Sequence, residues 1–340
     1  MHALIQELDQ HLALIQDRPL TSIFFGGGTP SLFSGKSIEA ILSAVAKRIP
    51  LTDKTEITLE ANPGTIDQQH FHHFRAAGIN RISLGIQSLQ NDKLKILGRI
   101  HDCDNAMRAI ECAKEAGFTN FNVDIMYGLP EQTIEDALHD IRTALSFQPS
   151  HFSWYQLTIE PNTFFYHQTP SLPHDETIWD MQVAGQALIK ESGFHQYEVS
   201  AYATSHHECI HNRNYWEFGD YLGIGAGAHS KITNMQTDEV IRFSQVKNPR
   251  DYLDAAKRQA FSPNIIAGND LAFEFMLNAL RLTDGVPVTL FSERTGLPLS
   301  SILPLLEKAK QRGLLITDES VICPSELGKK FLNDLVGMFL

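Results

Sequence analysis

The sequence predicts an α/β fold built from parallel strand–helix units, followed by a small winged-helix-like domain at the C-terminus. Two observations lead to this prediction. Short β-rich runs alternate with amphipathic helical stretches through the first two thirds of the 340 residues, as in a doubly wound sheet or a βα barrel. From Asp270 onward the pattern changes to several helices and one hairpin-like stretch, residues 314–325.

Six strands are predicted from the β-rich runs, at residues 22–25, 56–60, 81–87, 121–126, 152–159 and 197–203. Three helices between them end alike, with a glycine before an apolar residue, at Gly78, Gly117 and Gly193. Glycine readily adopts the left-handed conformation that ends a helix, and the apolar residue packs back on the last turn. Each of these glycines is therefore predicted to stop a helix.

Polar residues or glycines stand at the C-terminal ends of four successive predicted strands. Gly26, Gly27 and Gly28 follow the first, and Glu60, Gln87 and Asp124 lie at or near the ends of the next three. In a parallel barrel these ends converge on one face, where ligands bind. A single such residue is typical of a satisfied core polar group, but four in succession favour a barrel with a ligand site.

The glycine run in SIFFGGGTPSL, residues 22–32, has two interpretations. Glycine permits a tight turn, and it also lets a ligand approach the backbone closely. One glycine would serve a turn, so three favour a ligand that lies against backbone amides.

The N-terminal segment predicts an amphipathic helix, because Leu4, Leu8, Leu12 and Ile15 recur at helical spacing. No strand precedes it. The helix is either a decoration of the barrel or part of a βα unit whose strand and loop are missing from this sequence.

Composition limits the location and the partners. A formal net charge of −12 argues against broad nucleic-acid binding, and no apolar run approaches the ~18 residues of a membrane span. The segment from Asp270 to the end has nine acidic residues and seven Lys and Arg. This balance predicts a module that contacts a protein or covers the substrate, and not one that binds DNA. The protein is predicted to be cytoplasmic.

Five motifs occur in the order GGGTP, LEANP, LGIQS, LGRIH and VDIMYGLPEQT. Together they resemble the radical S-adenosylmethionine (SAM) proteins related to oxygen-independent coproporphyrinogen III oxidase, over nearly the whole chain. The resemblance implies a partial (βα)6 TIM-like radical SAM barrel in residues 1–235, without its N-terminal strand and cluster loop. A connecting segment at 236–267 and a winged-helix-like domain at 268–340 would follow.

The resemblance also implies a SAM site. The positions that match the family's SAM-binding residues are Gly27, Gly28, Thr29, Glu60, Gln87, Arg99 and Asp124. Bare glycine backbone would receive the amino group of SAM, and carboxylates accept hydrogen bonds from an ammonium or from ribose hydroxyls. Arg99 can fork onto a carboxylate, although an arginine in helical sequence is also typical of a solvated face.

The segment HNRNYW, residues 211–216, resembles the HNxxYW signature that separates the heme chaperones from true coproporphyrinogen oxidases. Imidazole is a ligand of heme iron, and aromatic rings cover porphyrin faces. His211 would either bind iron or orient the loop, while Tyr215 and Trp216 would pack on heme. We expect His206 and His207, just upstream, to be solvent-exposed.

The family's cysteine motif is absent. Radical SAM proteins hold a [4Fe–4S] cluster with CxxxCxxC, whereas Cys103, Cys112, Cys209 and Cys323 are separated by 9, 97 and 114 positions. Ligands of one cluster must meet on a short loop, so these cysteines are predicted to be unpaired thiols in a reducing compartment. Either the sequence begins inside a longer protein or the cluster was lost, and the absent first strand favours the former.

Two functions follow from the resemblance. HNRNYW favours a heme chaperone that carries heme to an acceptor, and the expected acceptor is a respiratory heme protein at the membrane periphery. SAM and the cluster would have a supporting role. The alternative is a radical SAM coproporphyrinogen III oxidase that decarboxylates porphyrinogen propionates. A third interpretation is a scaffold with a vestigial ligand site, because fold alone does not settle function. Heme transport is favoured over coproporphyrinogen oxidase activity.

Overall fold

The structure is a computed structural model that describes residues 1–65, 68–254 and 263–340. The chain divides into two units. Thr21–Leu42 and Lys54–Cys209 form one, here called the barrel unit, and Met1–Leu20, Ser43–Asp53 and Ile210–Leu340 form the other, here called the terminal unit. Residues 255–262, in the predicted connecting segment, lie outside the described residues, and the predicted division at 235 and 267 stays a prediction.

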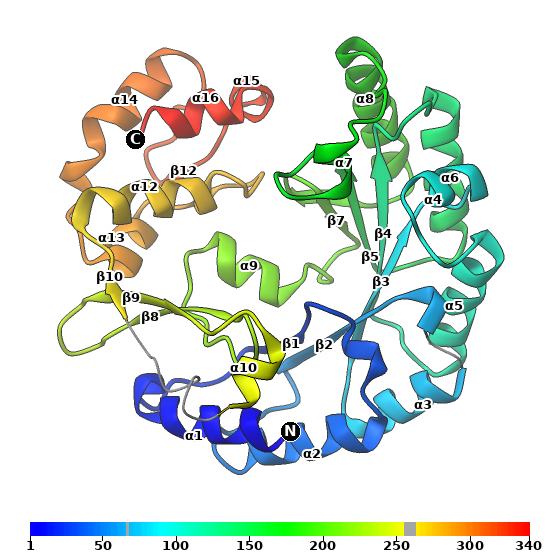
Figure 1. The fold of residues 1–340 in the computed structure, drawn as a ribbon. Coiled ribbons are helices and arrows are strands. Elements are labelled where there is room, and N and C mark those ends of the chain that lie inside the picture. The colour runs from blue at the N-terminus through cyan, green and yellow to red at the C-terminus, as the bar shows by residue number, and fades with distance from the viewer. Residues whose placement is uncertain (66–67, 255–262) are drawn as a thin grey trace. The chain divides into compact units, whose positions relative to one another are not determined.

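The barrel unit contains a curved seven-stranded sheet in the order β1-β2-β3-β4-β5-β7-β6 (Figure 1). Its strands are β1 (Ser22–Phe25), β2 (Glu56–Ala61), β3 (Arg81–Gln87), β4 (Phe121–Tyr127), β5 (His151–Gln156), β6 (His195–Glu198) and β7 (Ala201–Ala203). The first five are parallel neighbours. The predicted α/β fold with a partial barrel is confirmed.

The end of the sheet differs from the prediction of one strand at 197–203. Two strands cover this range, and β7 runs antiparallel to both β5 and β6. The reason is a tight turn between them, where the backbone N–H and the hydroxyl of Ser200 both donate to Glu198 Oε1, at 3.1 and 2.9 Å. Such side-chain to backbone bonds stabilise turns, so the chain reverses here instead of continuing.

Helices α3, α5, α6 and α8 cover the outer face of this sheet (Figure 1). The helices of this part of the chain are η1 (Pro30–Leu32), α2 (Gly35–Ala46), η2 (Pro63–Thr65), α3 (Gln68–Ala77), α4 (Asn91–Ile96), α5 (Cys103–Glu115), α6 (Ile134–Ser146), α7 (Phe164–His167) and α8 (Asp175–Glu191). Alternate strand residues, such as Ile82, Leu84 and Ile86, are fully buried in the apolar core against these helices.

Local sequence sets the helix ends. Gly78, Gly117 and Gly193 have φ of 111°, 85° and 90°, which confirms the three predicted stops. Helix α6 begins with a capping box, in which the Thr133 hydroxyl accepts from the Asp136 N–H and the Asp136 carboxylate accepts from the Thr133 N–H.

The terminal unit contains two small antiparallel sheets, β10-β9-β8 and β11-β12. Its elements are α1 (His2–Ile15), α9 (Ile210–Trp216), β8 (His229–Thr233), β9 (Val240–Ser244), α10 (Pro249–Leu253), β10 (Asn264–Ile265), α12 (Gly268–Ala279), β11 (Val286–Pro287), α13 (Thr289–Thr295), η3 (Leu299–Ser301), α14 (Leu303–Gln311), β12 (Val321–Ile322), α15 (Glu326–Lys330) and α16 (Leu332–Gly337). Among the described helices, none has the length and apolar character needed to cross a membrane.

Helix α1 buries polar residues beside its apolar ones. Leu8 is buried as predicted, but so are Glu7 and His11. Glu7 Oε2 accepts a hydrogen bond from Gly225 N–H at 3.0 Å and another from the Tyr252 hydroxyl. These bonds compensate the burial of the carboxylate and tie α1 to the loop at Gly225 and to helix α10, both far along the chain.

Candidate functional site

Polar side chains line the face of the sheet that is turned away from the helices. Glu60 pairs with Ser83, Ser83 with Asn122, and Asn122 with His151, so one polar row crosses four strands. Because side chains alternate between faces, residues two positions along belong to the same face. These further residues are Glu56, Thr58, Arg81, Asp124, Ser153 and Tyr155. Gln87 follows a register shift in β3 and joins them through its hydrogen bond with Tyr155. We call this face the lumen face.

The glycine run after β1 presents bare backbone. Gly27 and Gly28 have φ of 73° and 60°, and a Cβ built on either would have no atom within 4 Å. They are glycines because of their left-handed backbone, not for lack of space. The N–H of Gly27 donates to Glu60 Oε2 at 3.1 Å, so the loop is joined to the end of β2, and Thr29 follows as the residue before η1.

Two carboxylates of the lumen face share one environment. Burial raises the pKa of Glu60, the Gly27 N–H opposes this, and the charge of Asp124 raises the pKa further. Burial also raises the pKa of Asp124, against hydrogen bonds from Asn122 and Ser153 and the charge of Arg81. Acids whose ionisation is disfavoured in this way gain from a cationic or hydrogen-donating ligand.

Gln87 closes β3 in a conformation that side chains rarely adopt. Its φ is 73°, it is only 6% exposed, and the β3–β4 register shifts just before it. A left-handed residue other than glycine costs about 1–2 kcal/mol. Its Oε1 accepts a 2.6 Å hydrogen bond from the Tyr155 hydroxyl, and burial raises the pKa of Tyr155, so the phenol remains a donor.

Arg99 lies in an exposed turn after α4, not within a helix as its sequence suggests. Gly98 has φ of 67° and ends the helical stretch, and the Arg99 N–H donates to the Leu94 carbonyl at 2.9 Å. The positive charge of Arg99 is among the influences that lower the pKa of Tyr155. The guanidinium therefore belongs to the electrostatic surroundings of Gln87 and Tyr155.

Several residues of the lumen face are not among the site residues predicted from the sequence. They are Arg81, Asn122, His151, Ser153 and Tyr155. The signal that could have revealed them is the period of two within strands, for example His, Ser and Tyr at 151, 153 and 155. Apolar residues between them pack toward the helices. A strand with such alternation and a buried sheet position predicts a polar lumen.

The HNRNYW segment forms helix α9, and its aromatic residues cluster. The rings of His211 and Tyr215 lie edge to face with centroids 4.9 Å apart, and Tyr221 lies 4.4 Å from Tyr215. The Arg281 guanidinium lies 4.3 Å from the Trp216 ring. Burial raises the pKa of Tyr215 to about 12. The arrangement offers an imidazole, two flat rings and a cation within one unit.

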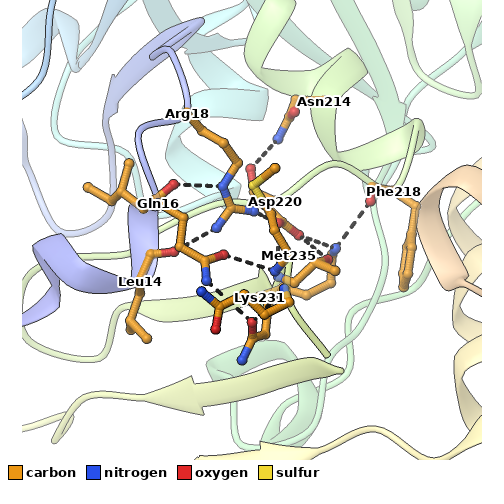
Figure 2. Close-up of polar contacts among 12 residues, drawn as sticks. Leu14, Gln16, Arg18, Asn214, Phe218, Asp220, Lys231 and Met235 are labelled. Atoms are coloured by element: carbon orange, nitrogen blue, oxygen red, sulfur yellow. Dashed lines mark hydrogen bonds and ion pairs between the residues drawn. The ribbon is translucent and has the colours of Figure 1, made fainter. Parts of the chain in front are cut away.

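A hydrogen-bond network centred on Asp220, four residues after α9, holds this helix in place (Figure 2). The Asn214 amide donates to the Asp220 carbonyl at 2.9 Å. The Asp220 carboxylate accepts from Arg18, from Lys231 at 3.0 Å, and from the N–H and hydroxyl of Thr233 at 2.8 and 2.9 Å. Arg18, just after α1, also donates to the Leu14 and Ile15 carbonyls at the end of that helix. The network therefore joins α9 to the end of α1 and to β8.

The two histidines upstream of α9 differ from each other. His206 is exposed, as predicted, at a turn with φ of 67°. His207 is only half exposed, because its Nδ1 lies 3.1 Å from the Thr204 hydroxyl and 3.0 Å from the Ser205 carbonyl.

Comparison with known proteins identifies the family. A Radical SAM superfamily model matches residues 2–144, and a HemN C-terminal domain model matches residues 266–331. The chain is 46% identical over 344 residues to heme chaperone HemW of Haemophilus influenzae, covering 100% of this chain and 89% of the relative. It belongs to the HemW family.

Other members and a solved structure agree. Heme chaperone HemW of Escherichia coli is 44% identical over 337 residues, covering 99% of this chain and 88% of that protein. HemW of Bacillus subtilis is 33% identical over 349 residues, covering 100% and 90%. Coproporphyrinogen III oxidase (HemN) from Escherichia coli matches with a TM-score of 0.80 at 22% identity, covering 99% of this chain and 82% of that one, which shows a common fold.

Membership of the radical SAM superfamily implies SAM and a [4Fe–4S] cluster for the HemW family. The described residues fit SAM better than the cluster. Gly27 and Gly28 leave open space beside a backbone without side chains, and burial disfavours the ionised forms of Glu60 and Asp124 on the lumen face. In contrast, no group of three His, Cys, Asp or Glu among the described residues is arranged to hold a metal ion.

The four cysteines make other contacts. All are free thiols, and Cys112, Cys209 and Cys323 are buried. The Cys209 thiol lies 3.5 Å from Glu56 Oε1, and the Cys323 thiol lies 3.4 Å from the Thr283 carbonyl. These residues do not fit the cluster, so we derive no chemistry through it.

Proposed function

We propose that the chain binds heme and delivers it to an acceptor heme protein, as the name heme chaperone implies for its HemW relatives. The observation that carries the proposal is the HNRNYW segment on α9, with His211 and Tyr215 in ring contact. Imidazole nitrogen ligates heme iron, and flat aromatic rings pack on porphyrin. The acceptor would be a respiratory heme protein, reached from the cytoplasm at the membrane periphery.

The Asp220 network supports this proposal because it orders the motif. Asn214 stands inside HNRNYW, and its Nδ2 donates to the Asp220 carbonyl. Gly219 has no side chain because a Cβ there would lie 2.1 Å from Asn214 Oδ1. A rigid helix loses little conformational freedom when it binds a ligand, so His211, Tyr215 and Trp216 would meet heme already positioned.

SAM would bind at the carboxyl ends of β1 to β4, held by Gly27, Gly28, Thr29, Glu60, Gln87, Arg99 and Asp124. The side-chain-free backbone of Gly27 and Gly28 would lie against its amino acid end, and Glu60 and Asp124 would accept hydrogen bonds from it. When bound, SAM supplies a sulfonium centre, whose positive charge suits these two acids. Arg99, in the exposed turn, would donate two parallel hydrogen bonds to a carboxylate.

Heme titration followed by visible spectroscopy tests the proposal. The unaltered protein is expected to bind heme about one to one, with a shifted Soret band. His211→Ala should weaken binding by about tenfold or more, the loss of one good contact, and change the spectrum.

His206→Ala is the matched control, because His206 is an exposed histidine a few residues upstream. It should bind heme like the unaltered protein. No saturable binding by the unaltered protein would refute the chaperone function. Equal affinity and spectra for His211→Ala would instead leave His211 as a residue that orients the loop.

A further inference from the structure

A chain of buried hydrogen bonds runs beneath Asp124. Asn122 Nδ2 donates to Asp124 Oδ1 at 2.7 Å, and Asn122 Oδ1 lies 2.7 Å from His151 Nδ1. His151 Nε2 lies 2.8 Å from the Tyr197 hydroxyl, which in turn accepts from the Cys209 N–H at 3.4 Å. Asn122, His151 and Tyr197 are each at most 2% exposed. The chain connects strands β4, β5 and β6.

The direction of each hydrogen bond follows from chemistry. The Asp124 carboxylate only accepts, so the Asn122 amide must turn its NH2 group toward it and its oxygen toward His151. His151 must then carry a proton on Nδ1. A neutral imidazole has one proton, so Nε2 accepts from the Tyr197 hydroxyl. Every donor therefore points along the chain toward Asp124.

The neutral state of His151 is secured by its surroundings. Burial holds the pKa of His151 well below its ordinary value, and the charge of Arg81 acts in the same direction. The ring contacts Tyr197 edge to face at 5.6 Å. The tautomer with the proton on Nδ1 is thus the one that satisfies all its partners, and the opposite tautomer would place two lone pairs together at Asn122.

We propose that His151 and Tyr197 are positioning residues for Asp124, because they hold Asn122 in the amide orientation that donates to this carboxylate. The carboxylate then keeps a fixed direction in which it accepts hydrogen bonds from a ligand. This inference rests on the proposed SAM site, and it adds a second layer to that site, since neither His151 nor Tyr197 is among the residues expected to touch SAM.

Other titratable groups also face Asp124. They are Arg81 on β3, Glu60 on β2 and Tyr155 on β5. Arg81 favours the ionised carboxylate, and Glu60 disfavours it. The Asn122 oxygen also accepts from the Ser153 hydroxyl at 3.0 Å, and its NH2 group also donates to the Ser83 hydroxyl at 2.8 Å. When the chain is broken, Ser153 is the remaining donor to the amide oxygen, so the NH2 group is held less firmly toward Asp124. The carboxylate then has a weaker donor and is protonated at a higher pH. SAM affinity should then decline at a higher pH than in the unaltered protein.

The experiment measures SAM affinity of the full chain by calorimetric titration between pH 5.5 and 8.5. His151→Phe removes the Nδ1 donor, and we expect affinity about tenfold lower at pH 7, with the fall in affinity moved to higher pH. Tyr197→Phe keeps the ring and the His151–Asn122 hydrogen bond and removes only the donor to His151 Nε2, so it should lower affinity by about twofold to threefold. It also carries the test if His151→Phe does not fold.

Ser150→Ala is the matched control. Ser150 is buried beside His151, and its hydroxyl accepts from the Phe121 N–H at 3.1 Å, but it is not part of the chain to Asp124. It should lower stability without changing SAM affinity or its pH profile. If His151→Phe binds SAM with the affinity and pH profile of Ser150→Ala, the inference alone is overturned. No SAM binding by the unaltered protein removes the proposed SAM site together with the inference.

A second measurement needs no variant. Nitrogen-15 spectra of the histidine rings in the unaltered protein should show His151 neutral, with its proton on Nδ1, throughout pH 5.5 to 8.5. A proton on Nε2, or an imidazolium signal in this range, would overturn the proposed direction of the chain whatever the SAM affinity.

Discussion

Asp220 in the terminal unit and Asp124 in the barrel unit are both carboxylates with several hydrogen-bond donors, yet their pKa values move in opposite directions. Burial raises the pKa of Asp220, but the Lys231 ammonium and the Thr233 donors outweigh it and lower the pKa. For Asp124, burial outweighs the donors and the pKa is raised. The first carboxylate is compensated within the protein, and the second is not.

The difference lies in the cations. Lys231, 2% exposed, lies 3.0 Å from Asp220, and Arg18 contacts the other oxygen. On the lumen face, Arg81 Nε lies 3.9 Å from Glu56 Oε2 and has no hydrogen-bond partner among the described residues. Glu60 and Asp124 therefore retain surplus negative charge. In a structural network the charged groups pair with one another, whereas in a ligand site some charged groups have no counter-ion until the ligand binds.

The same substitution in the two regions tests this comparison, and Asp220→Asn should have the larger effect on stability. It leaves Lys231 buried without its counter-ion, which typically costs about 3–5 kcal/mol. We expect a lower midpoint of urea unfolding. Heme binding should weaken as well, because the substitution loosens the side-chain bonds from Arg18, Lys231 and Thr233 that fix the backbone of residue 220, whose carbonyl is the acceptor of Asn214 in helix α9.

Arg142→Gln serves as a control, since Arg142 makes an exposed ion pair with Glu135, and exposed pairs contribute little. The folded-state pKa of Asp220 is depressed. Its contribution to stability is therefore present above the unfolded pKa and lost as the pH falls through the folded pKa. A stability loss in Asp220→Asn as small as that in Arg142→Gln would contradict the assigned role.

Asp124→Asn should act with the opposite sign. The raised folded pKa means that the ionised carboxylate destabilises the fold above that pKa. The amide removes this charge, so unfolding free energy at pH 7 should rise, and SAM affinity should fall by about tenfold or more because a charged acceptor is lost.

The pH dependence provides the check on Asp124→Asn. Since Asp124 becomes protonated as the pH falls through its raised pKa, the stability difference between the two proteins should shrink on acidification. Urea unfolding at pH 5 and pH 8, with calorimetric SAM titration, measures both quantities. Lower stability of Asp124→Asn at pH 8 would show that the protein compensates this charge after all.

Much of the fold could be predicted because local signals agree with it. The five parallel strands follow the β-rich runs, and the stops at Gly78, Gly117 and Gly193 follow from glycine chemistry. The reversal at Ser200 could not, since it depends on a side-chain bond to Glu198 within a run that reads as one strand. Local β propensity does not encode strand direction.

The candidate site could be predicted only where residues stand at strand ends. Gly27, Glu60 and Asp124 do, and the structure couples them by a hydrogen bond and by charge. His151 and Tyr197 could not be found in this way, because each acts through a neighbour on another strand. Such contacts depend on strand register, which is fixed only when the sheet has formed.

Gln87→Gly tests a last difference between the two units, which is the role of a left-handed residue other than glycine. Of the substitutions considered, it should have the smallest effect on stability. Glycine relieves the left-handed backbone, but it frees the unfolded chain and leaves the Tyr155 hydroxyl without its acceptor, so the net change should stay within about 1 kcal/mol. SAM affinity should nevertheless fall by about tenfold.

Asp238→Gly is the matched substitution in the terminal unit, where Asp238 has φ of 57° in an exposed turn. It relieves a similar backbone without touching the lumen face, so SAM affinity should not change. Strain at an exposed turn serves only the turn, whereas strain at Gln87 would hold its amide toward the ligand. If both glycine variants keep full SAM affinity in calorimetric titration, the Gln87 conformation is a feature of the β3–β4 bulge alone, and the strain no longer distinguishes the ligand site from the structural network.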